Sequence, residues 1–185
     1  MRIITGKLKG RQLPIPQTGE LRPTSDRAKE GLFAVIAARR YFEGYRVLDL
    51  FAGSGNLGFE ALSRGADYAV FVDLNPDHIQ HIEKYGRLFN VETQISTRTL
   101  STEQFLATSP QPFDIIFSDP PYDYPYMQEM IDNILTKGWL IPDGWFILEH
   151  DKRHNFESHP NLFYTKPYGR TIVSMFQDQP VDSEK

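Results

Sequence analysis

Between residues 45 and 149, short apolar runs alternate with segments of helical periodicity. The apolar runs are predicted to form strands at residues 45–51, 69–72, 93–95, 113–118 and 145–149. The segments between them are predicted to form helices that end near residue 62 or span residues 76–89, 103–106 and 126–136. Strands that alternate with helices predict a parallel sheet with helices on both faces. Sheets of this kind bind ligands at the carboxyl ends of their strands.

The last part of the chain departs from this alternation. Residues 161–164 and 171–176 are both strand-like, but only a short segment around Pro167 and Gly169 separates them. A crossover between parallel strands needs a dozen or more residues, so these two strands should pair antiparallel. We therefore expect a seven-stranded, mostly parallel sheet whose last strand is antiparallel.

Length and composition set the broad class of the protein. A chain of 185 residues with 40% hydrophobic and 24% charged residues is typical of one globular domain. Cysteine is absent, which excludes disulfides, thiolate catalysis and Cys-ligated metal sites and suits the cytoplasm. The N-terminus has no apolar signal-peptide core, and no stretch reaches the roughly 18 apolar residues of a membrane span. We expect a cytoplasmic protein without a membrane partner, monomeric by default.

Charge is unevenly distributed along the chain. Residues 1–40 carry nine basic and three acidic side chains, so they contribute +6 to a net charge of −4, and the remainder carries −10. Two extended runs around turn glycines predict a small hairpin in this segment, and a helix is predicted from Pro23–Asp26 to about Arg40. A basic extension suits nucleic-acid phosphates, although an ordinary solvated surface explains the charge equally well. The predicted organisation is an N-terminal basic extension at 1–40, a main domain at 41–178 and a frayed tail at 179–185.

A glycine-rich turn follows the first predicted strand. Gly53, Gly55 and Gly58 match G-x-G-x-x-G, and Asp73 closes the second strand, where its carboxylate could accept two ribose hydroxyls. Asp49, four residues before Gly53, would repel a pyrophosphate but attract a cationic sulfonium or ammonium group. This pattern favours S-adenosylmethionine over a nicotinamide dinucleotide. The alternative is a tight strand-to-helix turn with a capping aspartate.

A proline-rich loop follows the fourth predicted strand. Asp119-Pro120-Pro121-Tyr122 would hold the Asp119 carboxylate and a neighbouring carbonyl at one point, because two prolines fix the backbone. Such paired acceptors suit the two hydrogens of an exocyclic amino group and would draw its nitrogen toward a nucleophilic, pyramidal form. Tyr122 could stack on a flipped-out base. The alternative is a stiffened loop with a buried tyrosine.

Other chemically notable side chains are interpreted as structural. No Cys and no carboxylate at ligand spacing accompanies the histidines, so no metal site is predicted. The histidines are interpreted as surface residues: His78, His81, His150, His154 and His159. Tyr124 and Tyr126 could help to cover a base, but aromatic residues that open a helix more often serve packing.

With these motifs in place, the chain resembles, nearly end to end, the RsmD family of bacterial 16S ribosomal RNA guanine-N2 methyltransferases. The resemblance covers residues 2–11, 21–33, 48–58, 60–66 and 119–122. Many methyltransferases share the glycine loop, and those that act on amino groups share the Asp-Pro-Pro-Tyr loop. The basic segment joined to Arg22-Pro23-Thr24 is the feature most specific to this family.

The resemblance implies a Rossmann-like class I methyltransferase with S-adenosylmethionine as methyl donor, S-adenosylhomocysteine as product and no metal. It implies methyl transfer to the N2 amino group of a guanine in 16S ribosomal RNA, within a partly assembled small ribosomal subunit. Two alternatives remain open. One is the same chemistry on DNA adenine or cytosine or on a protein glutamine, and the other is a non-catalytic ribosome-assembly factor.

The resemblance also implies site residues. Arg22 and Thr24 would border the methionine end of the cofactor, and Ser101 stands where family members commonly contact adenine with Asp or Asn. The expected cofactor-binding residues are Arg22, Thr24, Asp49, Phe51, Gly53, Gly55, Asp73, Ser101 and Asp119. The expected catalytic residues are Asp119, Pro120 and Tyr122. The expected RNA-binding residues are Lys7, Lys9, Arg11 and Arg27.

Overall fold

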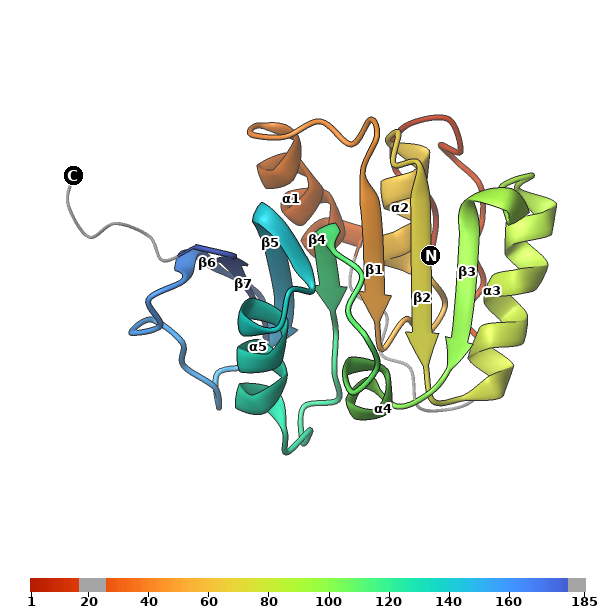
Figure 1. Ribbon diagram of the computed structural model, residues 1–185. Coiled ribbons are helices and arrows are strands. Elements are labelled where there is room, and N and C mark those ends of the chain that lie inside the picture. The colour runs from red at the N-terminus through yellow and green to blue at the C-terminus, as the bar shows by residue number, and fades with distance from the viewer. Residues whose placement is uncertain (17–25, 180–185) are drawn as a thin grey trace.

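The structure, a computed structural model, describes residues 1–16 and 26–179. A seven-stranded sheet stands at the centre, with helices on both faces (Figure 1). The helices are α1 (Asp26–Ala37), α2 (Asn56–Ser63), α3 (Pro76–Leu88), α4 (Thr102–Leu106) and α5 (Met127–Thr136). The strands are β1 (Arg46–Leu50), β2 (Tyr68–Asp73), β3 (Ile95–Thr99), β4 (Phe113–Ser118), β5 (Leu140–His150), β6 (Leu162–Tyr168) and β7 (Thr171–Gln177). Within the described residues, no helix combines the length and apolar character that a membrane span requires.

The strands are ordered β3-β2-β1-β4-β5-β7-β6. The first five pair in parallel, and β7 pairs antiparallel with both β5 and β6. The predicted seven-stranded sheet with an antiparallel last strand is confirmed. Because β1 to β5 run in one direction, the residues that end them converge on one edge of the sheet, which lies at the bottom of Figure 1.

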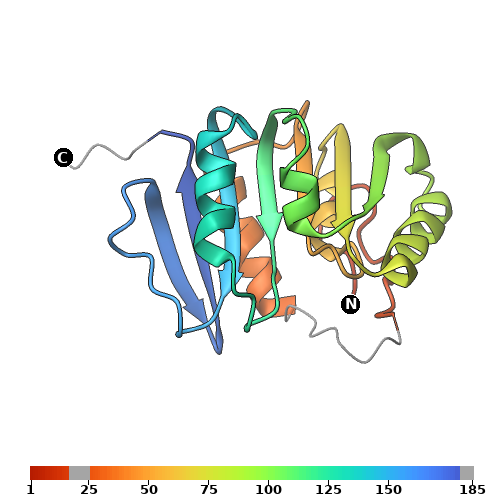
Figure 2. The ribbon, with the colours of Figure 1, turned by 60° about the horizontal axis from the view of Figure 1, so that its bottom comes forward.

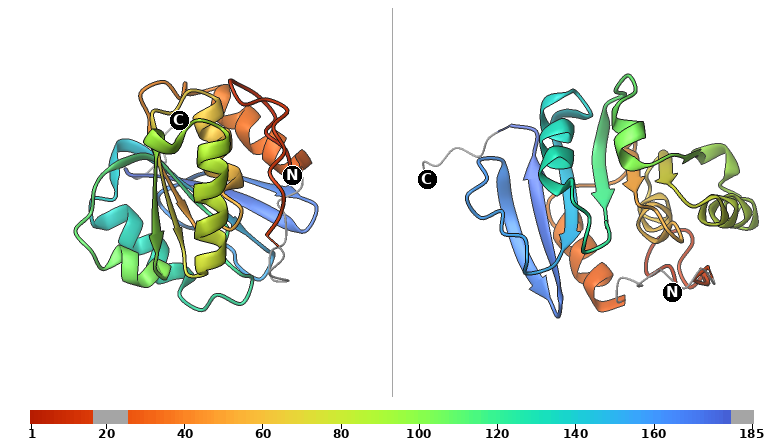
Figure 3. Two further views of the ribbon diagram at one scale, coloured as in Figure 1. Left: turned by 90° about the vertical axis from the view of Figure 1, so that its right-hand side faces the viewer. Right: turned by 90° about the horizontal axis from the view of Figure 1, so that it is seen from below.

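Successive strand residues point into two different apolar clusters. Val47 of β1 packs with residues of α1, α2 and α3, whereas Leu48 and Leu50 pack with residues of α4 and α5. Figures 2 and 3 show the corresponding layers, with α4 and α5 on one side of the sheet and α1, α2 and α3 on the other. The alternation buries the sheet on both faces and leaves its carboxyl edge open for ligands.

The N-terminal segment forms the predicted hairpin, but its strands are too short to count as regular β-strands. Arg2 and Gln12 make an isolated antiparallel bridge, supported by hydrogen bonds from the Ile3 amide to the Arg11 carbonyl (3.0 Å) and from the Gly10 amide to the Ile3 carbonyl (2.9 Å). The Leu13 amide also donates to the Met1 carbonyl (3.0 Å), and Ile3 is buried in the apolar cluster that contains residues of α1, α2 and α3.

The N-terminal segment packs on the end of α2. The Lys7 amide donates to the Ser63 carbonyl (2.8 Å), while Leu8 and Leu13 are buried in the same core cluster as Val47. Gly6 has φ +89°, and a Cβ there would lie 1.7 Å from the Ser63 carbonyl oxygen, so only glycine fits. Residues 1–16 thus share the core of the main domain, and the division at residue 40 stays a prediction.

Element boundaries differ from the prediction in several places, and β6 continues to Tyr168 rather than ending near residue 164. The third strand was expected at residues 93–95, but Glu92–Gln94 form a 3₁₀ turn and β3 spans Ile95–Thr99. This prediction was wrong because β3 is an edge strand whose polar, partly exposed sequence lacks an apolar run. Helix α1 ends at Ala37 rather than near residue 40, and β5 begins at Leu140, earlier than expected. In the tail, residues 180–185 lie outside the described part of the chain.

Candidate active site

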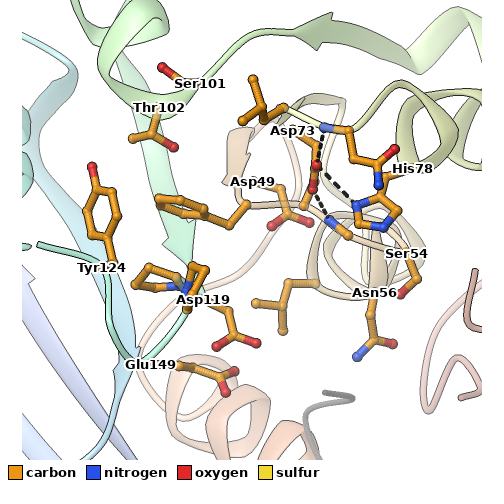
Figure 4. Close-up of a pocket in the computed structure, with 18 of the residues that line it drawn as sticks. Asp49, Ser54, Asn56, Asp73, His78, Ser101, Thr102, Asp119, Tyr124 and Glu149 are labelled. Atoms are coloured by element: carbon orange, nitrogen blue, oxygen red, sulfur yellow. Dashed lines mark hydrogen bonds and ion pairs between the residues drawn. The ribbon is translucent and has the colours of Figure 1, made fainter. Parts of the chain in front are cut away.

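A cavity of about 830 Å³ opens at the carboxyl edge of the parallel strands. Its walls come from the segments that follow β1, β2, β3, β4 and β5 (Figure 4). Its size lies within the range of small-molecule and cofactor sites. The predicted site residues that line it are Asp49, Phe51, Gly53, Asp73, Ser101, Asp119, Pro120 and Tyr122.

The glycine turn shapes the cavity floor and packs α2 on the sheet. Gly53 lines the cavity with φ +55°, a conformation that favours glycine. Gly55, with φ +79°, is the N-cap of α2, and its backbone packs against Phe59 rather than lining the cavity. A Cβ on Gly58 would lie 2.3 Å from the Phe71 ring. Gly55 and Gly58 therefore serve the close packing of α2.

Asp73 ends β2 with its carboxylate bound to the surrounding loops. Its Oδ2 accepts from the Gly53 amide (2.8 Å), and its Oδ1 accepts from the Asn75 amide (2.8 Å) and contacts Nδ1 of His78 (3.1 Å). His150, which is 3% exposed and contacts the Ser174 hydroxyl at 2.8 Å, was wrongly interpreted as a surface histidine, and so was His78, which is only 4% exposed. The contact with Asp73, made from the first turns of α3, accounts for its burial. The carboxylate is thereby fixed at the cavity wall.

Asp49 is buried on β1 behind the glycine turn. Its Oδ2 accepts from the Gly58 amide (2.9 Å). Burial raises the pKa of the Asp49 carboxyl well above its usual value; the Gly58 hydrogen bond lowers it, and the Asp119 and Asp73 carboxylates raise it further. A cation beside Asp49 would favour its charged form, so the site suits a cationic ligand.

The Asp119–Tyr122 loop begins directly after β4. Asp119 and Tyr122 are half-buried, and Pro120 between them is buried. The Arg153 guanidinium lies 5.8 Å from the centre of the Tyr122 ring. Asp119, Pro120 and Tyr122 line the cavity, and so does Arg153. The loop therefore contributes an acceptor, a rigid turn and an aromatic face to one space.

Tyr124 lines the cavity and also packs. Its ring centre lies 5.0 Å from that of Phe51, and its hydroxyl donates to Glu103 (2.5 Å). Burial and the Glu103 hydrogen bond raise the pKa of Tyr124, which keeps the hydroxyl neutral. Tyr126 is 48% exposed and does not line the cavity. The predicted packing role of Tyr124 is thus confirmed, and the side chain also forms part of the cavity wall.

Ser101 lines the cavity at the start of α4. Its hydroxyl accepts from the Gln104 amide (3.2 Å), and the Gln104 side chain accepts from the Ser101 amide (3.0 Å). This capping box positions Ser101 and, with it, Thr102, which also lines the cavity. Contact of Ser101 with adenine remains a prediction.

Several lining residues were not among the predicted site residues. Glu149, near the end of β5, is 2% exposed and lines the cavity, as do Asn56, Leu74, His78 and Arg153. Glu149 had a readable signal, because it ends a predicted apolar strand as Asp73 does. The other four carried no such signal, since their positions depend on how α2, α3 and the loops pack.

The predicted RNA-binding residues lie outside the cavity, on the exposed surface. Lys7, Lys9, Arg11 and Arg27 are exposed. The Lys7 ammonium donates to Gln94 (2.8 Å), and the Arg11 guanidinium lies 6.0 Å from the centre of the Phe89 ring. Their contact with RNA remains a prediction. Arg22 and Thr24 fall outside the described residues.

The lining chemistry fits the expected cofactor. Asp49 and Glu149 supply carboxylates for a cationic group, and Asp73 supplies one for hydroxyls. Leu74 and Leu100, neighbours of Asp73 and Ser101 in sequence, add apolar lining for a purine. Among residues 1–16 and 26–179, no group of three or more His, Asp or Glu side chains is placed to hold a metal ion. Independence from metal remains a prediction.

Comparison with known proteins identifies the family of the chain. Residues 1–177 match the protein family described as conserved hypothetical protein 95. The ribosomal RNA small subunit methyltransferase D of Haemophilus influenzae is 36% identical over 177 residues, which cover 94% of this chain and 91% of that protein. Its Escherichia coli counterpart is 32% identical over 182 residues, which cover 96% of this chain and 89% of that protein.

Solved structures share the fold. The structure of yhhF from Escherichia coli has a TM-score of 0.84 at 32% identity and covers 96% of this chain, with 97% of that chain matched. An RNA methyltransferase from Salinibacter ruber, in complex with S-adenosyl-L-homocysteine, has a TM-score of 0.67 at 14% identity, covers 88% of this chain with 98% of that chain matched, and supports the fold alone. The fold is thus that of the Rossmann-like methyltransferases. The chain belongs to the conserved hypothetical protein 95 family, which is the RsmD family that its motifs predicted.

Proposed function

We propose that this protein transfers a methyl group from S-adenosylmethionine to the N2 amino group of a guanine in 16S ribosomal RNA. One observation carries the proposal: the Asp119–Tyr122 loop shares a single cavity with Asp49 and Asp73. The loop suits an amino group, and the two aspartates suit a cationic nucleoside. The names of the relatives, ribosomal RNA small subunit methyltransferases, support the choice of RNA.

Asp119 is the main catalytic residue in this proposal. Its carboxylate accepts hydrogens from the substrate amine, holds the nitrogen lone pair toward the methyl donor, and takes up the proton that the nitrogen loses. Pro120 is buried and fixes this geometry. S-adenosylmethionine, when bound, supplies the methyl group as a sulfonium substituent.

Tyr122 holds the base in this proposal. Its half-buried ring lines the cavity beside Asp119 and stacks on the extruded guanine, worth roughly 1–3 kcal/mol. Stacking offsets part of the cost of taking the base out of its helix. Pro121, which is exposed, leaves this face of the loop open to RNA.

The N-terminal segment binds the RNA backbone in this proposal. Lys7, Lys9 and Arg11 are exposed on one packed segment, and Arg27 is exposed at the start of α1. Such cations give sequence-independent affinity for phosphates. The substrate is a partly assembled small ribosomal subunit, and the enzyme acts in the cytoplasm as a monomer.

A methyl-transfer assay separates this proposal from its alternatives. Tritium-labelled S-adenosylmethionine is supplied with small subunits from a strain that lacks the activity, with plasmid DNA, or with a protein mixture. We expect label in the small-subunit RNA, and none from an Asp119→Ala variant. Label in DNA or in protein would contradict the choice of RNA. Binding of the small subunit without transfer of label would favour the assembly-factor alternative.

A further inference from the structure

Asn56 places an amide in the wall of the cofactor cavity. It is the first residue of α2, is 7% exposed and lines the cavity. Its Nδ2 is buried and has no hydrogen-bond partner among the described residues. Figure 4 shows Asn56 on the side of the pocket that also carries Asp119 and Glu149, away from Ser101 and Thr102.

A buried lysine fixes the orientation of this amide. The Asn56 Oδ1 accepts a hydrogen bond from the Lys29 ammonium at 2.8 Å. Because an ammonium only donates, the oxygen must face Lys29, and the nitrogen must be the remaining donor. Lys29 is itself fully buried, 3.2 Å from the Glu60 carboxylate and 2.6 Å from the Arg2 carbonyl. The amide therefore cannot rotate to satisfy its nitrogen without losing the Lys29 contact.

An unsatisfied buried donor is costly, and a ligand that accepts from it recovers that cost. The charge of the cavity lining indicates which ligand group accepts this hydrogen bond. Asp49, Asp119 and Glu149 give their part of the wall a negative character, so an anionic ligand group can enter only where donors compensate. Asn56 provides such a donor, and it does so at the amino end of α2, where the helix dipole favours an anion.

We propose that the Asn56 Nδ2 donates a hydrogen bond to the carboxylate of the methionine moiety of S-adenosylmethionine, an inference that rests on the proposed function. The methionine moiety carries an ammonium and a carboxylate on one carbon. The carboxylates of Asp49 and Glu149 suit the ammonium, and the Asn56 amide suits the carboxylate. Asn56 is then a cofactor-binding residue oriented by Lys29.

The test compares two ligands that differ only in this carboxylate. Calorimetry measures the binding of S-adenosylmethionine and of decarboxylated S-adenosylmethionine to the purified protein and its variants. We expect Asn56→Ala to weaken S-adenosylmethionine about 10- to 100-fold, which is the range for a hydrogen bond to a charged group. The affinity for decarboxylated S-adenosylmethionine should change less than about threefold, because neither the wild-type protein nor Asn56→Ala can make this contact with a ligand that lacks the carboxylate.

A second variant separates ligand binding from the support of Lys29. Asn56→Asp keeps an acceptor for the Lys29 ammonium but removes the donor, so thermal unfolding should stay close to that of the wild-type protein. Affinity for S-adenosylmethionine should fall at least as far as in Asn56→Ala, since two carboxylates then face each other. Asp73→Asn serves as the matched control, because a change at the ribose should weaken both ligands by the same factor.

Equal losses for both ligands in Asn56→Ala, or an unchanged affinity for S-adenosylmethionine in Asn56→Asp, would overturn the inference. Failure of the wild-type protein to bind S-adenosylmethionine would overturn both the inference and the proposed cofactor. If the carboxylate-dependent loss is observed but no RNA is methylated, the inference stands and the proposed function falls.

Discussion

The Glu60 carboxylate ties the N-terminal segment to the rest of the protein, and its removal gives the sharpest stability prediction. Glu60 is fully buried on α2 and accepts from the Ile4 amide (2.8 Å) and the Thr5 amide (3.1 Å). It also pairs with the Lys29 ammonium (3.2 Å) and the Arg64 guanidinium (2.9 Å). Two backbone amides and two cations therefore depend on one side chain.

Glu60→Ala should destabilise the protein by about 3–5 kcal/mol, because it removes the countercharge of a fully buried lysine. For a domain of 150–250 residues, about 2–4 °C of Tm is lost per kcal/mol, so Tm should fall by roughly 6–20 °C. Urea unfolding and a thermal scan at matched protein concentration measure both quantities. A loss below about 1 kcal/mol would refute the reasoning, because it would mean that the buried pair is effectively solvated.

A double variant provides the control. Replacing both charges, as in Lys29→Met with Glu60→Leu, removes the buried ion pair without leaving an isolated charge. Such replacements are often neutral or stabilising, so the double variant should recover part of the stability that Glu60→Ala loses. The two amides of Ile4 and Thr5 would still lack their acceptor, so recovery should be incomplete.

Three further predictions concern the site and the extension. Asp119→Ala should lower turnover by roughly 10²- to 10⁴-fold with cofactor affinity nearly unchanged, since its contacts are to the substrate amine; loss of cofactor binding by calorimetry would sink this assignment. Asp73→Ala should weaken cofactor binding about 10- to 100-fold before it affects turnover at saturation; an unchanged affinity would remove it from the ribose. Changing Lys7, Lys9 and Arg11 together to Glu should weaken RNA binding and reduce the magnitude of the negative slope of log K against log salt by roughly 2–3; an unchanged slope would mean that these side chains form an ordinary solvated surface.

The sheet was predictable from the sequence wherever a strand is buried on both faces. β1, β2, β4 and β5 are strongly apolar, and each was located from its run of residues. β3 was misplaced because an edge strand needs no continuous apolar run, and Ile95, the one apolar residue of β3, packs toward α3 at Gly86. Local pattern thus locates central strands, and edge strands depend on tertiary contacts.

The site was predictable to the extent that strand ends define it. Asp49, Asp73 and Asp119 lie at or next to the carboxyl ends of parallel strands, so their convergence follows from topology. Asn56 and His78 could not be found in this way, because they lie on helices and reach the cavity through the packing of α2 and α3.

The charge count also overstated the basic surface. Lys29 was counted with the basic extension, but it is fully buried and paired with Glu60. The Arg40 guanidinium lies 4.3 Å from the centre of the Trp145 ring, where part of its surface is covered by the ring. Exposed cations such as Lys7, Lys9 and Arg11 are therefore the better indicators of where phosphates bind.

The most direct test of the central claim is mass spectrometry of nucleosides from small-subunit RNA of cells with and without this protein. We predict that cells without it lack one N2-methylguanosine, and that the wild-type gene restores this nucleoside whereas the Asp119→Ala variant does not. An unchanged N2-methylguanosine content would contradict the assignment of the base and of the acceptor atom.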